Sequence, residues 1–207
     1  LVPVNASDYP ALFDEASVHP AVCSFRNSMY FDEIYHWRTA YEFLHGLTSY
    51  ENTHPPMGKI LIALGVAVFG MNPFGWRIAG TLFGIVMVPI IYLFARKILK
   101  STLPALLVCV LFAFDFMHFT QTRIATIDVY ITFFVLLMYY FMYQYLCLSF
   151  YDTPLKKTLL PLGACGICMG LGVACKWTGV YAGCGLALLF FSSLYGRYRE
   201  YLYAKKD

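Results

Sequence analysis

Apolar segments about as long as a bilayer is thick follow one another through the second part of this chain. The best candidates for membrane-spanning helices are residues 76–98, 102–119, 129–150, 158–175 and 178–196. A helix of roughly 20 apolar residues is long enough to cross the hydrocarbon core of a bilayer. Only 13% of the residues are charged, whereas a soluble domain carries about 25% charged residues. The sequence therefore predicts an all-α membrane protein with a five-span bundle over residues 76–196.

The basic residues predict the orientation of these spans. The segments 96–101, 151–157 and 197–207 fall on one side of the predicted bundle and hold nine Lys and Arg residues. Short cytoplasmic segments are enriched in Lys and Arg, so we expect this side, with its basic tail 197–207, to face the cytoplasm. The opposite side is then extracytoplasmic.

Residues 29–46 are predicted to form an amphipathic helix with the adjacent carboxylates Asp32 and Glu33 near its start. The apolar side chains that recur every three or four residues are Tyr30, Ile34, Trp37, Tyr41 and Leu44. A segment with this much charge is too polar to cross a bilayer. We expect it to lie along the extracytoplasmic surface, with its aromatic rings at the level of the lipid headgroups.

A second short helix is predicted after Pro55 and Pro56. Residues 57–71 are apolar, but this run of 15 residues is shorter than the roughly 20 that a span needs. We interpret it as a second interfacial or re-entrant helix, so that residues 29–75 form an extracytoplasmic region. The alternative is a short tilted span, which would move the acidic pair to the cytoplasmic side, away from Arg77.

The two ends of the chain indicate that it is part of a longer protein. Residues 1–28 are mostly polar and contain three prolines, and we expect them to form an extracytoplasmic loop. The sequence thus begins in a loop and ends in a basic tail after a hydrophobic helix.

Ionisable side chains are expected to gather on the extracytoplasmic side. They are Asp32, Glu33, His54, Lys59, Arg77, Arg123, Asp128 and Lys176. Ionisable groups at membrane depth are costly and often functional, and several cations at one interface favour an anionic ligand such as a lipid phosphate. Simpler interpretations exist for single members: Arg77 and Lys176 as interface anchors, Lys59 as an anchor of its helix, and Arg123 paired with Asp128.

Together these residues suit the transfer of a sugar from a lipid phosphate. Such a reaction needs a base for the acceptor hydroxyl and cations that stabilise the departing phosphate. The chain carries no Gly-rich phosphate loop of the Walker type and no recognisable metal site. The sequence requires no cofactor and leaves a divalent metal open, and its small net charge of +3 argues against nucleic acid as a partner.

At these residues the chain resembles the protein O-mannosyltransferase family in its compact bacterial form. Five sequence blocks carry the resemblance in the family's order: Phe31–Tyr35 (FDEIY), His54–Gly65 (HPPMGKILIALG), Phe74–Gly80 (FGWRIAG), Arg123–Asp128 (RIATID) and Cys175–Gly179 (CKWTG). The resemblance implies a type C glycosyltransferase fold, an extracytoplasmic active site and an integral location in a bacterial plasma membrane. It also implies a polyprenyl-phosphate sugar as donor, of the dolichyl or undecaprenyl type, and a protein or peptide as acceptor. Membrane lipids are expected to surround the helices.

The resemblance also implies roles for individual residues. Asp32 matches the family's catalytic base, and Arg77 an arginine suited to the donor phosphate. Glu33 matches the second catalytic acid, and we expect it to position the acceptor or to support Asp32. We expect Arg123 and Lys176 to assist Arg77. Candidates for substrate binding are His54, Lys59, Asp128 and Trp177.

Two departures from the family pattern affect the substrates. Eukaryotic members have His where this chain has Tyr35, followed here by His36, and they carry a longer insertion before the arginine. Related aminoarabinose transferases have Lys before the two prolines, so His54 favours the protein-modifying group. We predict transfer of mannose to Ser or Thr hydroxyls of proteins with inversion. The alternatives are the same enzyme class with a lipid or glycan acceptor, and a transporter or lipid-binding membrane module.

Overall fold

All regular secondary structure in the described part of the chain is α-helical. The structure is a computed structural model that describes residues 29–30, 32–149 and 153–205. Its helices are α1 (Glu33–His45), α2 (Met57–Phe69), α3 (Pro73–Leu99), α4 (Thr102–Ala113), α5 (Phe116–Gln121), α6 (Asp128–Leu146), α7 (Leu155–Cys175) and α8 (Gly179–Ala204). The predicted loop 1–28 lies outside the described residues. The all-α fold class is confirmed.

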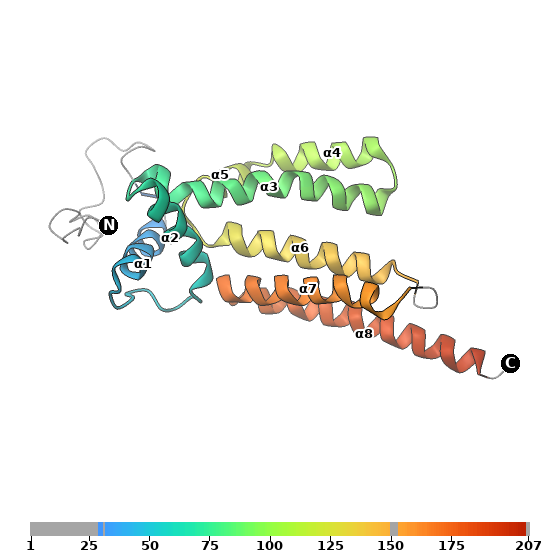
Figure 1. The fold of residues 1–207 in the computed structure, drawn as a ribbon. Helices are drawn as coiled ribbons and strands as arrows, with labels where there is room; N and C mark the ends of the chain where they lie inside the picture. The colour runs from blue at the N-terminus through green and yellow to red at the C-terminus, as the bar shows by residue number, and fades with distance from the viewer. Residues whose placement is uncertain (1–28, 31, 150–152, 206–207) are drawn as a thin grey trace.

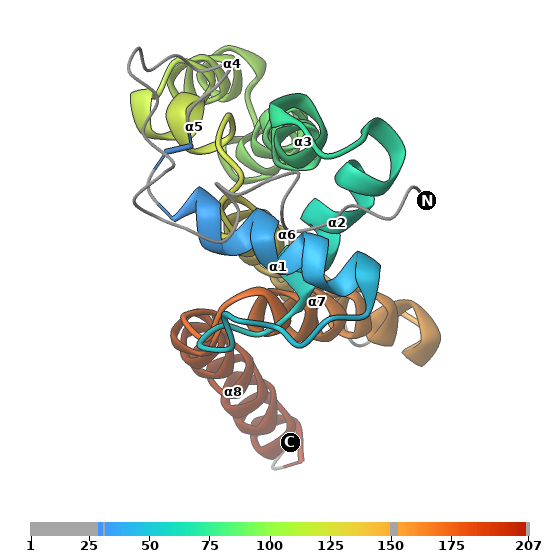
Figure 2. The same cartoon turned by 90° about the vertical axis from the view of Figure 1, so that its left-hand side faces the viewer.

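The long helices run lengthwise, and the short helices α1 and α2 gather at one end (Figure 1). Viewed toward that end, α1 lies across the bundle (Figure 2). The turn between α3 and α4, the connection between α6 and α7 and the C-terminal end of α8 lie away from α1 (Figure 1). We call the end of the bundle that carries α1 and α2 the α1 end. We call the opposite end the basic end, because residues 96–101, 153–157 and 197–205 lie at it. The segments rich in Lys and Arg therefore lie at the opposite end of the bundle from α1, as the charge pattern predicts.

Among the described residues, four helices are long and apolar enough to cross a membrane. They are α3, α6, α7 and α8, with 27, 19, 21 and 26 residues, and their positions match four of the five predicted spans. This supports the predicted membrane character of the chain. Helix α8 continues to Ala204, so much of the predicted basic tail is helical.

The expected single span over residues 102–119 is wrong as a continuous helix. Helix α4 ends at Ala113, and Asp115 accepts a hydrogen bond from the backbone N–H of His118 at 2.8 Å, so it caps the separate helix α5. An aspartate at such a position satisfies a helix start and competes with an unbroken helix. With 12 residues, α4 alone is shorter than the roughly 20 residues of a span.

Helix α1 differs from the predicted surface helix in how it is buried. It ends at Gly46, as the sequence indicates, and this residue has a left-handed φ of 66° that suits glycine. The polar residues Glu33, Thr39 and Glu42 are buried. So are the central members of the apolar stripe, Ile34, Trp37 and Tyr41. Helix α1 is therefore held on several sides by other elements, and its expected place at a membrane surface stays a prediction.

The packing at the α1 end fixes α1 and α2 against the long helices. The indole rings of Trp37 in α1 and Trp76 in α3 stack with their centroids 4.8 Å apart. Gly58 in α2 packs so closely on the residue before α6 that an added Cβ would lie 2.7 Å from Cγ2 of Ile127. These contacts bring the start of α1, α3 and α6 to one place.

We expect Gly58→Ala to destabilise the protein, because its new methyl group would overlap the buried Ile127 side chain. Overpacking of this kind costs about 1–3 kcal/mol. The matched control is Gly163→Ala in α7, where an added Cβ meets nothing within 4 Å among the described residues. Thermal unfolding in detergent micelles should show a lower midpoint for Gly58→Ala alone. Equal midpoints for the two variants would contradict the close packing of α2 on Ile127.

Candidate active site

The centre of the α1 end is the buried carboxylate of Glu33. Its side chain is fully inaccessible to solvent. The guanidinium of Arg77 forms a bidentate pair with this carboxylate, with Nε 2.7 Å from Oε1 and Nη2 2.7 Å from Oε2. The backbone N–H groups of Ala125 and Tyr30 also donate to it, at 2.7 Å and 2.8 Å. A buried charge needs such compensation, and here both oxygens of the carboxylate are used.

Each partner of Glu33 comes from a different part of the chain. Glu33 lies in the first turn of α1, where a carboxylate is favoured by the helix dipole. Arg77 lies in the first turns of α3, which is capped by the Asn72 side chain at the N–H of Gly75. Ala125 belongs to the turn that precedes α6. Glu33 thus links α1 to α3 and to the turn before α6. An acidic residue at this position is needed to bind Arg77 and the N–H group of Ala125.

Asp32 has a different environment although it is the next residue in the chain. It is the N-cap residue of α1, but its side chain makes no capping hydrogen bond. It is partly exposed, and within the described residues its carboxylate has no ion-pair partner. Of the two tandem acids, Glu33 is buried and ion-paired, whereas Asp32 is partly exposed and has no ion pair within the described residues.

Arg77 and Arg123 border one cavity of about 790 Å³, which is lined also by residues at the start of α3. The guanidinium of Arg123 lies over the ring of Phe119, 3.5 Å from its centroid. Arg123 is exposed, and no carboxylate of the described residues pairs with it. The structure therefore brings together two of the three cations that were predicted to hold a phosphate.

Lys176 is paired elsewhere. Its ammonium group lies 2.7 Å from the carboxylate of Asp128, an ion pair that joins the end of α7 to the start of α6. The simpler interpretation in which Asp128 pairs with Arg123 is wrong. Neither Lys176 nor Asp128 lines the cavity of Arg77 and Arg123, and the neighbouring Trp177 is exposed.

Lys59 organises the loop that carries His54. Its side chain is 1% exposed. The ammonium group pairs with the Glu51 carboxylate and donates to the backbone carbonyls of Glu51 at 2.8 Å and His54 at 3.3 Å. Burial alone would raise the pKa of Glu51, but hydrogen bonds from Lys59 and Thr53 outweigh it and lower that pKa to about 2. Lys59 thus stabilises the loop that contains Glu51 and His54.

His36 and Glu51 also belong to this region, although no sequence motif predicts a role for them. The rings of His36 and His54 lie with their centroids 6.5 Å apart. Both Nδ1 atoms are buried and have no hydrogen-bond partner among the described residues. Burial lowers the pKa of His36 to about 4, although the charge of Glu51 opposes this shift. The only signal in the sequence was that His36 lies off the apolar stripe of its helix.

Fold and site together define a helical membrane protein with a buried carboxylate–guanidinium pair and a partly exposed carboxylate at one end of its bundle. The chain belongs to the dolichyl-phosphate-mannose-protein mannosyltransferase family, whose sequence profile matches residues 67–205. The resemblance found in the sequence is thereby confirmed. No solved structure matches the chain significantly.

Curated relatives named polyprenol-phosphate-mannose–protein mannosyltransferase are similar to this chain. The relative from Mycobacterium tuberculosis (strain CDC 1551 / Oshkosh) is 34% identical over 157 residues, which cover 68% of this chain and 29% of the relative. The relative from Mycolicibacterium smegmatis (strain ATCC 700084 / mc(2)155) is 31% identical over 173 residues, which cover 73% of this chain and 33% of the relative. The chain thus spans about a third of the length of these relatives.

We expect Glu33→Gln to destabilise the protein far more than Asp32→Asn. The first change leaves the guanidinium of Arg77 without its buried counter-charge, and breaking a buried pair costs about 3–5 kcal/mol. The second change alters an acid with no described ion-pair partner. Unfolding midpoints of the two variants in the same detergent measure the difference, and a midpoint for Glu33→Gln close to wild type would contradict the supporting role of Glu33.

His36 should make the stability depend on pH in a defined range. Its pKa is about 4 in the folded protein against an ordinary 6.5, so between these values the unfolded chain binds more protons. Stability is then lost as the pH falls from about 6.5 to 4. We expect His36→Gln to flatten the fall of the unfolding midpoint over that range. The matched control His45→Gln, in the last turn of α1, should keep the wild-type slope; equal slopes in all three proteins would refute the assignment.

Proposed function

We propose that this chain carries the donor and base side of an enzyme that transfers mannose from a polyprenyl phosphate to protein hydroxyls. The observation that carries the proposal is the contrast between the tandem acids: Glu33 is bound to Arg77, while Asp32 next to it is open. An acid of this second kind suits a general base that must reach a substrate. Membership of the mannosyltransferase family supports the choice of reaction.

The reaction we propose is a single displacement. The oxygen of a Ser or Thr hydroxyl attacks C1 of the mannose, and the bond between C1 and the phosphate oxygen breaks on the opposite face, so the configuration inverts. The hydroxyl proton passes to Asp32, and the bonding electron pair leaves with the polyprenyl phosphate. The products are an O-mannosyl protein and the lipid phosphate.

The cations stabilise the charge that builds on the leaving phosphate. Arg123 is exposed at the cavity and has its guanidinium fixed against Phe119. Arg77 lines the same cavity and is held in a fixed direction by Glu33. We assign Glu33 a positioning role through Arg77. We assign His54 to binding of the acceptor. Its ring lies near that of His36 in α1.

The location we propose follows from the two ends of the bundle. The α1 end, with the tandem acids, faces the extracytoplasmic side of a bacterial plasma membrane, and the basic end faces the cytoplasm. The donor's lipid tail then lies among the helices, with its phosphate at the level of the cavity that Arg77 and Arg123 line. The names of the curated relatives support mannose as the sugar and protein as the acceptor.

The test is an assay in membranes with labelled polyprenyl-phosphate mannose and a Ser/Thr peptide. We expect wild-type protein to give O-mannosyl peptide, identified by mass spectrometry, and Asp32→Asn to abolish transfer at an unchanged unfolding midpoint. The matched control Asp115→Asn removes one carboxylate but keeps a residue that caps α5 well, and should retain activity. Turnover by Asp32→Asn would refute the base assignment, and label found in a lipid or glycan instead of the peptide would refute the protein acceptor.

A further inference from the structure

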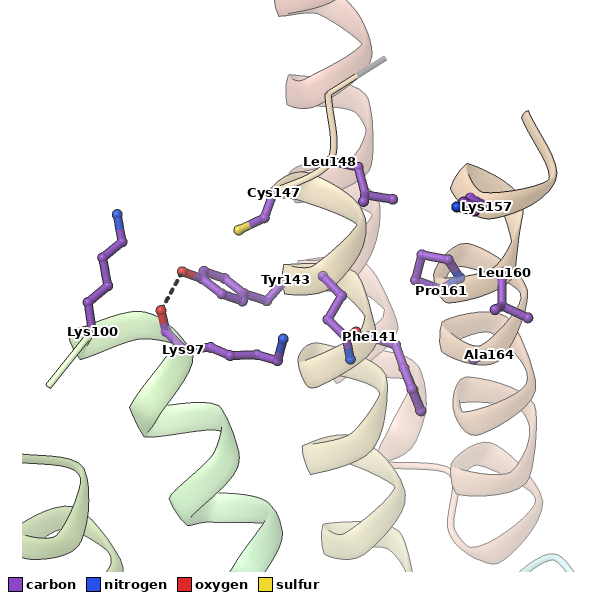
Figure 3. Close-up of a pocket in the computed structure, with 11 residues that line it drawn as sticks. Lys97, Lys100, Phe141, Tyr143, Cys147, Leu148, Lys157, Leu160, Pro161 and Ala164 are labelled. Atoms are coloured by element: carbon purple, nitrogen blue, oxygen red, sulfur yellow. Dashed lines mark hydrogen bonds between the residues drawn. The ribbon is translucent and has the colours of Figure 1, made fainter. Parts of the chain in front are cut away.

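A second cavity lies at the basic end, far from the tandem acids. It has a volume of about 690 Å³ and lies between α3, α6 and α7, with α6 packed against both neighbours. Figure 3 shows side chains from these three helices around it. The proposed sugar transfer makes no use of this space, so its occupant is a separate question.

Three lysines give the cavity a positive rim. Lys97 and Lys100 come from the end of α3, and Lys157 comes from the first turn of α7. All three are exposed, and within the described residues none of their ammonium groups pairs with a carboxylate. This contrasts with the α1 end, where Lys59, Arg77 and Lys176 are each bound to an acid. Three cations around one cavity, without a carboxylate partner in the described part of the chain, favour an anionic ligand.

The backbone at Lys100 is unusual. It is the C-cap residue of α3 and has a φ of 52°, the only positive φ of a non-glycine residue in the described chain. Glycine or asparagine normally occupies such a position, because a side chain there costs of order 1 kcal/mol. A lysine held in this conformation is consistent with a function for its side chain at the cavity rim.

The wall beneath the lysines is apolar. Leu160, Pro161 and Ala164 of α7 line one side and Phe141 of α6 another. The hydroxyl of Tyr143 lies at the rim and donates to the backbone carbonyl of Lys97 at 3.3 Å, as Figure 3 shows. The cavity therefore joins a cationic mouth to a hydrocarbon-like wall, and a free phosphate would use only the first of these two parts.

We propose that this cavity binds an anionic phospholipid, with the headgroup phosphate among Lys97, Lys100 and Lys157 and an acyl chain against the α7 wall. Basic pockets between membrane helices on the cytoplasmic side suit anionic headgroups, which are concentrated in that leaflet. The site is independent of the sugar-transfer reaction. Its expected consequence is a bound lipid that bridges the ends of α3 and α7 over α6.

The test is lipid binding by the full chain in detergent, followed by native mass spectrometry. The probes are dioleoyl phosphatidylglycerol, dioleoyl phosphatidylcholine and inorganic phosphate. We expect the phosphatidylglycerol to bind at least tenfold more tightly than the phosphatidylcholine. The triple variant Lys97→Gln, Lys100→Gln, Lys157→Gln should lose most of that preference, since each basic side chain near a lipid surface contributes roughly a fivefold factor.

Two further proteins make the test specific. The matched control Arg96→Gln, Lys156→Gln, Lys205→Gln removes the same charge from the same end at exposed residues that do not line the cavity, and should keep the preference. Ala164→Trp fills the wall without changing any charge, and should weaken binding of the phosphatidylglycerol. It also keeps the proposal testable where the triple variant fails to fold.

Three results would overturn the proposal. The first is equal binding of the two lipids by wild-type protein. The second is an equal loss in the cavity variant and the matched control, which would indicate a general attraction to the basic end. The third is displacement of the phosphatidylglycerol by millimolar inorganic phosphate, which would make the ligand a free phosphate.

Discussion

The end of the bundle that carries the candidate active site depends on one buried ion pair, between Glu33 and Arg77. Removing two charges from water is costly, and the cost is recovered only when geometry and hydrogen bonding are good. Here the guanidinium fills one edge of the carboxylate, and the N–H groups of Ala125 and Tyr30 fill the remaining positions. The pair therefore also fixes the turn before α6 relative to α1 and α3.

This constraint explains how two adjacent acids come to have different environments. Successive residues on a helix point about 100° apart, so when Glu33 turns inward to Arg77, Asp32 cannot share that environment. Asp32 remains at the start of α1, partly exposed, while the site beside it is rigid. A catalytic base needs both properties: freedom from internal partners and a fixed position relative to the substrate.

The sequence predicts the helices well and their contacts poorly, for a physical reason. Apolar length identifies α3, α6, α7 and α8, and Gly46 marks the end of α1, because these signals are local. The break before α5 was also readable from Asp115, a good helix-capping residue, but the apolar run around it outweighed that signal. The polar face of α1 shows the limit, since the helical period identifies which side is apolar and not what the polar side meets.

The ion pairs of the site could not be predicted, because their partners are distant in sequence. Glu33 and Arg77 are 44 residues apart, and Asp128 and Lys176 are 48 apart. The sequence predicts these residues on one side of the bundle, and it groups Arg77, Arg123 and Lys176 around one phosphate. Only the packing of α7 against α6 decides that Lys176 binds Asp128 instead.

The two ends of the bundle use cations in opposite ways. At the α1 end, Lys59, Arg77 and Lys176 are joined to carboxylates, and such pairs position backbone and side chains while leaving little net charge. Arg123 is the cation there without a carboxylate partner among the described residues, which is why it is the better candidate for direct contact with a phosphate. At the basic end the lysines around the cavity pair with no carboxylate of the described residues. Cations that are paired with carboxylates hold elements of the fold together, and cations without such partners in the described chain carry charge that an anionic ligand can use.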